Sequence, residues 1–229
     1  MPKLLRTAVT AIGGLLLIAA SPSRAASFLD AEGHIERGLA AVDAGGRDMR
    51  FARLLAQARG VLIVPHIGVG GPVIGFPGGE GLLVTQHDGL WSDPVFYHVG
   101  EITVTGWTGL TRRSLIILLM SQKAVDAVTY HGQASLNGPS GLSVVSYQSA
   151  SAAAVFNRDV IVWSNAPMAM SSRNIGVSGL SPDRPEDRAF YGQDLTISDI
   201  LGGVVWTAQS STLGAELHRL AGRSTAKPN

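Results

Sequence analysis

Apolar residues recur at helical spacing across residues 30–58 and predict two helices ahead of any strand. Ile35, Leu39 and Val42 fall on one face of the first helix, because side chains three and four positions apart lie on the same side of a helix. Gly45-Gly46 then interrupts the pattern before the apolar spacing resumes. We therefore expect a helical segment with a break near its middle.

After Gly60 the pattern changes to short apolar runs separated by glycine, which is typical of strands. The predicted strands are residues 61–64, 81–85, 95–99, 102–107, 115–120, 142–147, 152–156, 160–163 and 174–177. Asp88-Gly89 predicts a tight hairpin, since glycine supplies the positive φ that such turns require. Residues 115–120 and 160–163 contain no charged side chain, so these two strands are expected to be covered on both faces.

Helices are predicted again toward the end of the chain. Ser121 is a suitable N-cap for a helix that runs through Tyr130, and two further helices are expected at residues 197–201 and 212–221. Strands thus dominate the middle of the chain, and helices lie at its ends. The predicted fold class is α+β: an antiparallel, strand-rich sandwich or barrel covered by N-terminal and C-terminal helices.

The first 25 residues have the three parts of a secretory signal: a basic start, a short apolar run and a small-x-small cleavage site at Ser23-Arg24-Ala25. The alternative is a membrane span, but a span needs about 20 apolar residues and this run is shorter. We expect residues 1–25 to be a signal peptide, cleaved near Ala25/Ala26, and residues 26–229 to form one domain. The expected location is periplasmic or secreted, and without cysteine the protein is not a lipoprotein acylated on that residue and forms no disulfide.

Charge limits the possible partners. The whole chain has a formal charge of +1, but removal of the signal takes away Lys3, Arg6 and Arg24 and leaves 15 basic against 17 acidic residues, a net charge of −2. Nucleic-acid binding depends on a clear positive footprint, so it is not expected. Any anionic partner must instead be met by local groups of arginine.

Catalytic signatures are missing from the sequence. It has no nucleophile elbow, no zinc-protease motif, no Walker-type loop and no EF-hand loop. The glycines of residues 68–81 do not fit a dinucleotide fingerprint and are interpreted as tight turns and close strand packing. His87 beside Asp88, or His98 near Glu101, could form a local acid–base pair, but we assign neither a catalytic role. We expect no enzyme activity, no cofactor and no metal site.

Two groups of basic residues are the candidate site. Arg47, Arg50, Arg53 and Arg59 accompany the second N-terminal helix, and Trp107 lies near the pair Arg112-Arg113 in the strand-rich region. A guanidinium can bind phosphate through two parallel hydrogen bonds, which suits contact with lipid headgroups. The alternative for the helix is an ordinary solvated face with Asp43 and Asp48 as salt-bridge partners.

Several motifs in a fixed order resemble the SYLF (Ysc84-like) family. They are Ala58-Arg59-Gly60-Val61-Leu62-Ile63-Val64-Pro65, Gly70-Gly71, Gly79-Glu80-Gly81, Trp91-Ser92 with Pro94, Asp159-Val160-Ile161-Val162-Trp163-Ser164, Ala189-Phe190-Tyr191-Gly192 and Asp199-Ile200-Leu201. The resemblance spans roughly residues 51–203. The chain departs from the family pattern at residues 106–110 and 165–170.

The resemblance implies binding of phosphoinositide or other anionic phospholipid and, for some eukaryotic members, of actin. For this chain we expect a non-enzymatic lipid-binding module of the cell envelope, with an anionic phospholipid or membrane surface as partner. Actin is an unlikely partner for an exported protein. The alternative is a periplasmic structural or interaction protein that binds an envelope protein and has no lipid affinity.

Overall fold

A computed structural model describes residues 22–67, 76–104, 113–130, 134–148, 155, 157–165, 175–205, 207 and 210–223. The helices are α1 (Pro22–Gly46), α2 (Met49–Leu55), α3 (Gln122–Thr129), the short 3₁₀ helix η1 (Gly138–Ser140), α5 (Arg184–Tyr191), α6 (Ile197–Leu201) and α7 (Ser210–Arg223). The strands are β1 (Gly60–Val64), β2 (Phe76–His87), β3 (Leu90–Trp91), β4 (Val95–Val104), β5 (Leu115–Leu119), β6 (Ala134–Leu136), β7 (Val144–Ser146), β8 (Val160–Ser164) and β9 (Ile175–Pro182).

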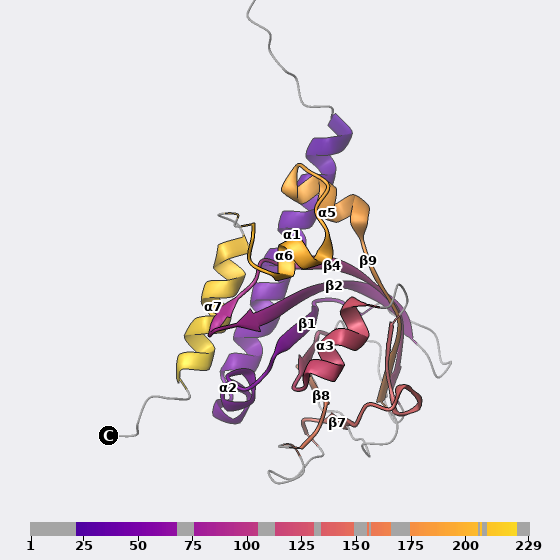
Figure 1. Ribbon diagram of the computed structural model, residues 1–229, viewed down its shortest axis with the longest axis vertical. Coiled ribbons are helices and arrows are strands. Elements are labelled where there is room, and N and C mark those ends of the chain that lie inside the picture. Colours follow the sequence, from indigo (N-terminus) through magenta and orange to yellow (C-terminus); the bar gives the residue numbers. More distant parts are fainter. Residues whose placement is uncertain are drawn as a thin grey trace, which may run out of the picture.

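The strands form one strongly curled sheet in the order β6-β9-β4-β2-β1-β5-β8-β7, with β3 paired to β2 (Figure 1). All of these pairs are antiparallel except β7–β8, which is parallel. Strands β7 and β9 approach within 8 Å between Cα atoms, so the sheet nearly closes on itself. The predicted α+β class, with a curled strand-rich sheet covered by terminal helices, is confirmed.

Helices cover both faces of the sheet (Figure 1). Leu62 and Val64 of β1 point into the curl, where they pack with residues of α3 and α6. Val61 and Ile63 point to the outer face, which α1, α2 and α7 cover. Every residue of β1, β5 and β8 is therefore buried, as predicted for β5 and β8 from their continuous apolar runs.

Two local signals in the sequence are confirmed. Asp88 and Gly89 form the turn between β2 and β3 with φ values of 51° and 82°, the left-handed conformations that a two-residue hairpin needs. Ser121 caps α3, where its hydroxyl oxygen accepts a hydrogen bond of 3.2 Å from the backbone N–H of Ala124. The break after α1 also lies where Gly45-Gly46 predicted it.

The structure differs from the sequence prediction in a few elements. The strands expected at 95–99 and 102–107 form one strand, β4, as far as Val104, and residues 105–107 lie outside the described residues. Gly100 lets this strand pass close to Gly179 of β9, since a Cβ on Gly100 would lie 3.1 Å from the Gly179 Cα. Helix α5 and strands β3 and β6 were not predicted. Most of the strand expected at 152–156 and most of the expected signal peptide lie outside the described residues. Among the described helices, none is long and apolar enough to span a bilayer.

Candidate functional site

The arginines of residues 47–59 lie on the turn before α2, on α2 itself and on the turn that leads into β1. Asp48 caps α2, since its Oδ1 accepts a 2.8 Å hydrogen bond from the Arg50 backbone N–H. The guanidinium of Arg50 lies over the Tyr147 ring, with Cζ 4.6 Å from the ring centroid, and the Tyr147 hydroxyl donates to the other Asp48 oxygen. This cation–π contact holds Arg50 against the sheet.

The other arginines on this end are exposed. Arg47 pairs with Asp43 at 3.4 Å, and the two side chains are 81% and 55% exposed, so the pair stabilises the fold little. Arg53 is exposed one turn further along α2. Of the expected acidic partners, Asp43 therefore forms the salt bridge, whereas Asp48 serves as the helix cap.

Arg59 is fixed by its backbone at the start of β1. Its N–H donates to the Leu119 carbonyl, and its own carbonyl accepts from the Gln86 N–H, both at 2.8 Å. The side chain lines a pocket of about 260 Å³ between α3 and α6. Tyr130, which is 77% exposed, lies on the same pocket.

Arg113 lies far from this group. Strands β1 and β5 pair antiparallel with Gly60 opposite Leu119 and Val64 opposite Leu115, so Arg113 and Arg59 are at opposite ends of the pair. Five residues of strand separate these ends by roughly 17 Å. Trp107 and Arg112 lie outside the described residues. Arg47, Arg50 and Arg53 thus lie on α2 or the turn before it, Arg59 lies beside the pocket of α3 and α6, and Arg113 lies at the other end of β1.

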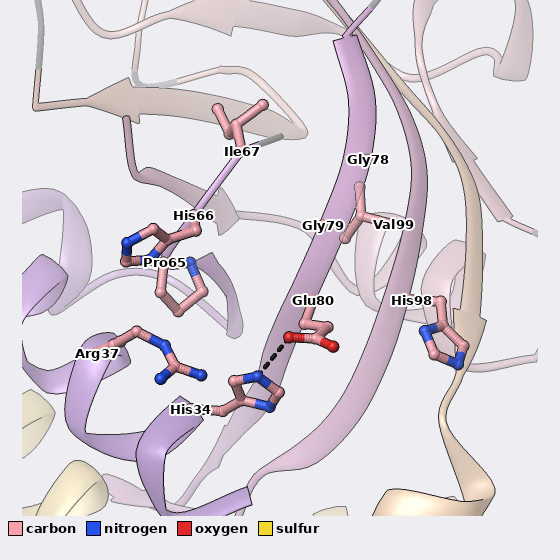
Figure 2. A pocket seen from close by; sticks show the side chains of 10 residues that line it. All are labelled: His34, Arg37, Pro65, His66, Ile67, Gly78, Gly79, Glu80, His98 and Val99. Carbon is pink, nitrogen blue, oxygen red and sulfur yellow. Dashed lines mark ion pairs between the residues drawn. The ribbon is translucent and has the colours of Figure 1, made fainter. Parts of the chain in front are cut away.

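A cleft of about 550 Å³ lies between α1, β2 and the end of β1 (Figure 2). Its lining residues are His34, Arg37, Pro65, His66, Ile67, Gly78, Gly79, Glu80, His98 and Val99. Figure 2 shows Arg37 and His34 of α1 on one side and Glu80 of β2 facing them. A second, more acidic pocket of about 360 Å³ shares His34 and Glu80.

His34 is bound on both sides. Its Nδ1 lies 2.5 Å from Glu186 Oε1 on α5, and its Nε2 contacts Glu80 Oε2. Burial lowers the pKa of His34, but the hydrogen bond to Glu186 and the charges of Glu186 and Glu80 outweigh it, so the pKa is raised above 6.5. The histidine therefore favours its charged form.

Further carboxylates surround this contact at the start of α5. Asp183 caps the helix and also binds His98 Nε2 at 2.9 Å. His98 thus pairs with Asp183 rather than with Glu101. His98 and Glu101 lie three residues apart on β4, so their side chains point to opposite faces of the sheet. Asp187 is buried and accepts a 3.0 Å hydrogen bond from the Phe96 N–H, and burial raises its pKa to about 7.

Little in the sequence pointed to this cluster. Glu80 lies just before a predicted strand, and Glu186 lies on α5, which was not predicted, 152 positions from His34. The glycine interpretation is confirmed at this cleft: a Cβ on Gly79 would lie 2.3 Å from the His66 carbonyl oxygen. Among the described residues, no group of three or more histidine or acidic side chains is arranged to hold a metal ion.

The fold is thus a curled, nearly closed sheet covered by helices, with a histidine–carboxylate contact where α1, β2 and α5 meet. Residues 100–220 match the sequence profile of Ysc84, described as Las17-binding protein actin regulator, and the chain belongs to this family. The predicted family is thus confirmed, although the matched residues begin later than the motifs at residues 58–94. The family is one of binding modules.

Two yeast proteins are similar to part of the chain. LAS seventeen-binding protein 3 of Saccharomyces cerevisiae (strain YJM789) is 26% identical over 157 residues. Protein YSC84 of Saccharomyces cerevisiae (strain ATCC 204508 / S288c) is 26% identical over 159 residues. Each alignment covers 66% of this chain and 34% of the relative, so the chain spans about a third of the length of these relatives.

Proposed function

We propose that this protein is a non-enzymatic module that binds anionic phospholipid headgroups through the surface formed by Arg47, Arg50, Arg53 and Arg59. The observation that supports the proposal is a run of arginines on α2 and the turn before it, with Arg59 at the turn into β1. Arg47 and Arg53 are exposed there, and among the described residues the weak pair with Asp43 competes for Arg47. Because the net charge after signal removal is −2, this local surface, rather than overall charge, is the attraction for a membrane.

Nearby side chains suit the boundary between headgroups and acyl chains. Met49 on α2 is 43% exposed between the arginines. At the pocket of Arg59, Tyr130 adds an exposed aromatic ring, and Ile197 and Leu201 supply apolar wall. Tyrosine is favoured at membrane interfaces because its ring is apolar and its hydroxyl is polar.

The proposed location is the periplasm or the cell exterior. The pattern of residues 1–25, with its basic start and its cleavage site at Ser23-Arg24-Ala25, supports export. An exported protein meets the outer surface of the inner membrane or the inner surface of the outer membrane. In that setting actin is not a partner.

A second candidate is a protein-interaction module of the envelope. It is supported by the names of the relatives, which describe a protein that binds LAS seventeen, and by the family description, which names Las17 binding. On this alternative the exposed apolar side chains Leu90 and Val204 meet a protein surface. It predicts co-purification with one envelope protein and equal retention by all liposomes.

Co-sedimentation of residues 26–229 with neutral and anionic liposomes, at low and high salt, tests the lipid proposal. We expect binding to the anionic vesicles that weakens as salt rises. Each basic residue near an anionic surface contributes about 1 kcal/mol, so Arg53→Glu or Arg47→Glu should weaken binding about fivefold or more.

Arg188→Glu is the matched control. Arg188 is also an exposed arginine with an acidic partner, Asp194 at 2.8 Å, but it lies on α5 rather than α2. It should leave binding unchanged. Equal losses for Arg53→Glu and Arg188→Glu would show that overall charge rather than the α2 surface is responsible, and no binding to any vesicle would favour the interaction module.

A further inference from the structure

His34 joins three elements of the fold at one point. It lies on α1, its Nε2 contacts Glu80 of β2 and its Nδ1 lies 2.5 Å from Glu186 of α5. The His34 and Glu186 side chains are each only 11% exposed. His34 is therefore a direct polar link between α1, β2 and α5.

The contacts require a particular protonation state. A carboxylate only accepts hydrogen bonds, so each ring nitrogen of His34 must carry a proton to bind its partner. Only the imidazolium has both protons. In the neutral ring one nitrogen presents a lone pair to a carboxylate, and a buried hydrogen bond becomes a repulsive contact.

Loss of the positive charge would leave an excess of negative groups. The charged and titratable groups around His34 are Asp30 and Arg37 on α1, Glu80 on β2, His98 on β4, and Asp183, Arg184, Glu186 and Asp187 on α5. The acids outnumber the arginines. Arg37 is exposed on the cleft side and Arg184 donates to the Leu195 carbonyl at 2.7 Å, so neither replaces the imidazolium between Glu80 and Glu186.

The link holds the N-terminal part of α1 in place. Phe28 stacks on Phe190 of α5, with ring centroids 5.8 Å apart. Ala31 and Ile35, also on α1, are buried. In Figure 1 this part of α1 runs alongside α5, beyond the edge of the sheet. Among the described contacts between α1 and α5, Phe28 meets Phe190 through apolar rings, whereas His34 meets Glu186 through charge. The contact of His34 with Glu186 is therefore the part of this junction that responds to pH.

We propose that His34 is a proton-operated latch that fastens the N-terminal part of α1 to β2 and α5 and releases it when the histidine loses its proton. Release uncovers Phe190 and the faces of Ala31 and Ile35 that the helix now buries. The latch is independent of lipid binding by α2, which lies at the other end of α1.

The direction of the pH dependence follows from His34. The pKa of His34 is raised in the folded state, so its stabilising effect is complete below its ordinary value of 6.5 and is lost as pH rises through the raised value. Burial raises the pKa of Asp187 to about 7, so the effect of Asp187 is lost as pH rises from 3.8 to about 7, and this carboxyl bonds to β4 rather than to α1. His34 therefore predicts a junction between α1 and α5 that is firm in mild acid and loose in mild alkali.

Hydrogen exchange of the full chain at pH 6 and pH 9 tests the latch. Amide protection, corrected for the intrinsic effect of pH, is compared between residues 28–35 and β5. In the wild type the protection of residues 28–35 should fall about tenfold for each unit by which the His34 pKa is raised, while β5 stays protected. His34→Gln should show the low protection already at pH 6 and lose the pH dependence.

His218→Gln is the matched control, since His218 is an exposed histidine that contacts only the Gly89 carbonyl at 3.1 Å among its described hydrogen bonds. It should behave as the wild type. Glu186→Gln keeps the shape of the partner but removes its charge, so it should lower the pKa of His34 and move the release to lower pH. A titration of the His34 ring by NMR measures the same change in pKa without unfolding the protein. Flat protection in the wild type, an ordinary His34 pKa, or the same pH response in His34→Gln would each overturn the latch.

Discussion

Close contact between neighbouring strands leaves no room for a side chain at Gly78. A Cβ built at this residue would lie 1.3 Å from the Val99 carbonyl oxygen of β4. Backbone atoms cannot move aside as a flexible side chain can, so the β2–β4 pairing itself fixes this residue as glycine. Gly89 differs, because a Cβ there meets no atom within 4 Å.

Gly78→Ala should therefore lower the free energy of unfolding by more than about 3 kcal/mol. Gly89→Ala, whose φ of 82° is strained only by the left-handed backbone, should cost about 1 kcal/mol. Urea unfolding of both variants measures the difference. Similar losses would contradict the close approach of β2 and β4.

His34 illustrates a limit of sequence reasoning at the same scale. Its residue type was visible, but its partners Glu80 and Glu186 are 46 and 152 positions away. No local spacing distinguishes it from the exposed His218. Its charge state depends on burial and on carboxylates brought by two other elements, which only the folded chain provides.

Asp159 connects several elements through one carboxylate. It accepts hydrogen bonds from the Ser121 hydroxyl at 2.6 Å and from the Ser143 N–H and hydroxyl at 2.9 and 2.8 Å. Ser121 caps α3, and Ser143 precedes β7, so the start of β8 is joined to both. Burial raises the pKa of Asp159, but these hydrogen bonds outweigh it and hold the pKa below 3.8.

Asp159→Ala should destabilise the protein by about 3 kcal/mol at pH 7, because charged hydrogen bonds are lost and two serines lose their acceptor. The pKa is lowered in the folded state, so the stabilising effect is present above 3.8 and is lost as pH falls through the folded value. Thermal unfolding at pH 7 and pH 3 should show the gap to wild type shrinking in acid. Asp126→Ala, which removes an exposed partner of Gln122, should give little change at either pH.

Elements were predicted well where local chemistry decides them. The hairpin at Asp88-Gly89 and the cap at Ser121 depend on backbone conformations that a few neighbouring residues set. Helix α5 was missed, although Asp183 accepts from the Glu186 N–H as an N-cap, because its eight residues include only two buried side chains. Of these two, only Phe190 is apolar, so one buried apolar residue was too little to mark a helix.

At the scale of the whole molecule, aromatic packing attaches the basic helix to the sheet. Phe51 of α2 is fully buried, with its ring 5.5 Å from Trp163 of β8 and 6.4 Å from Tyr147. The ring of Tyr147 in turn carries Arg50. The position of the proposed lipid-binding surface therefore depends on the outer core.

Phe51→Ala should reduce the free energy of unfolding by about 3 to 5 kcal/mol, the usual cost of emptying an aromatic site in a core. If the chain stays folded, liposome binding should also fall, because α2 loses its fixed orientation. Calorimetry measures the first effect and co-sedimentation the second. The exposed Tyr130→Ala variant should leave the unfolding free energy nearly unchanged, and a comparable loss there would contradict this assignment of the core.

The sequence by itself determined the α+β class, the buried strands β5 and β8, the helical termini and the family, because periodicity, turn residues and motifs are local properties of the chain. It also placed Arg47, Arg50, Arg53 and Arg59 near one another, since they lie within 13 residues. Only the tertiary structure decided that Arg113 lies at the other end of β1, and that His34 meets Glu80 and Glu186. Those relations depend on strand order and helix packing, which bring together residues that no spacing in the sequence connects.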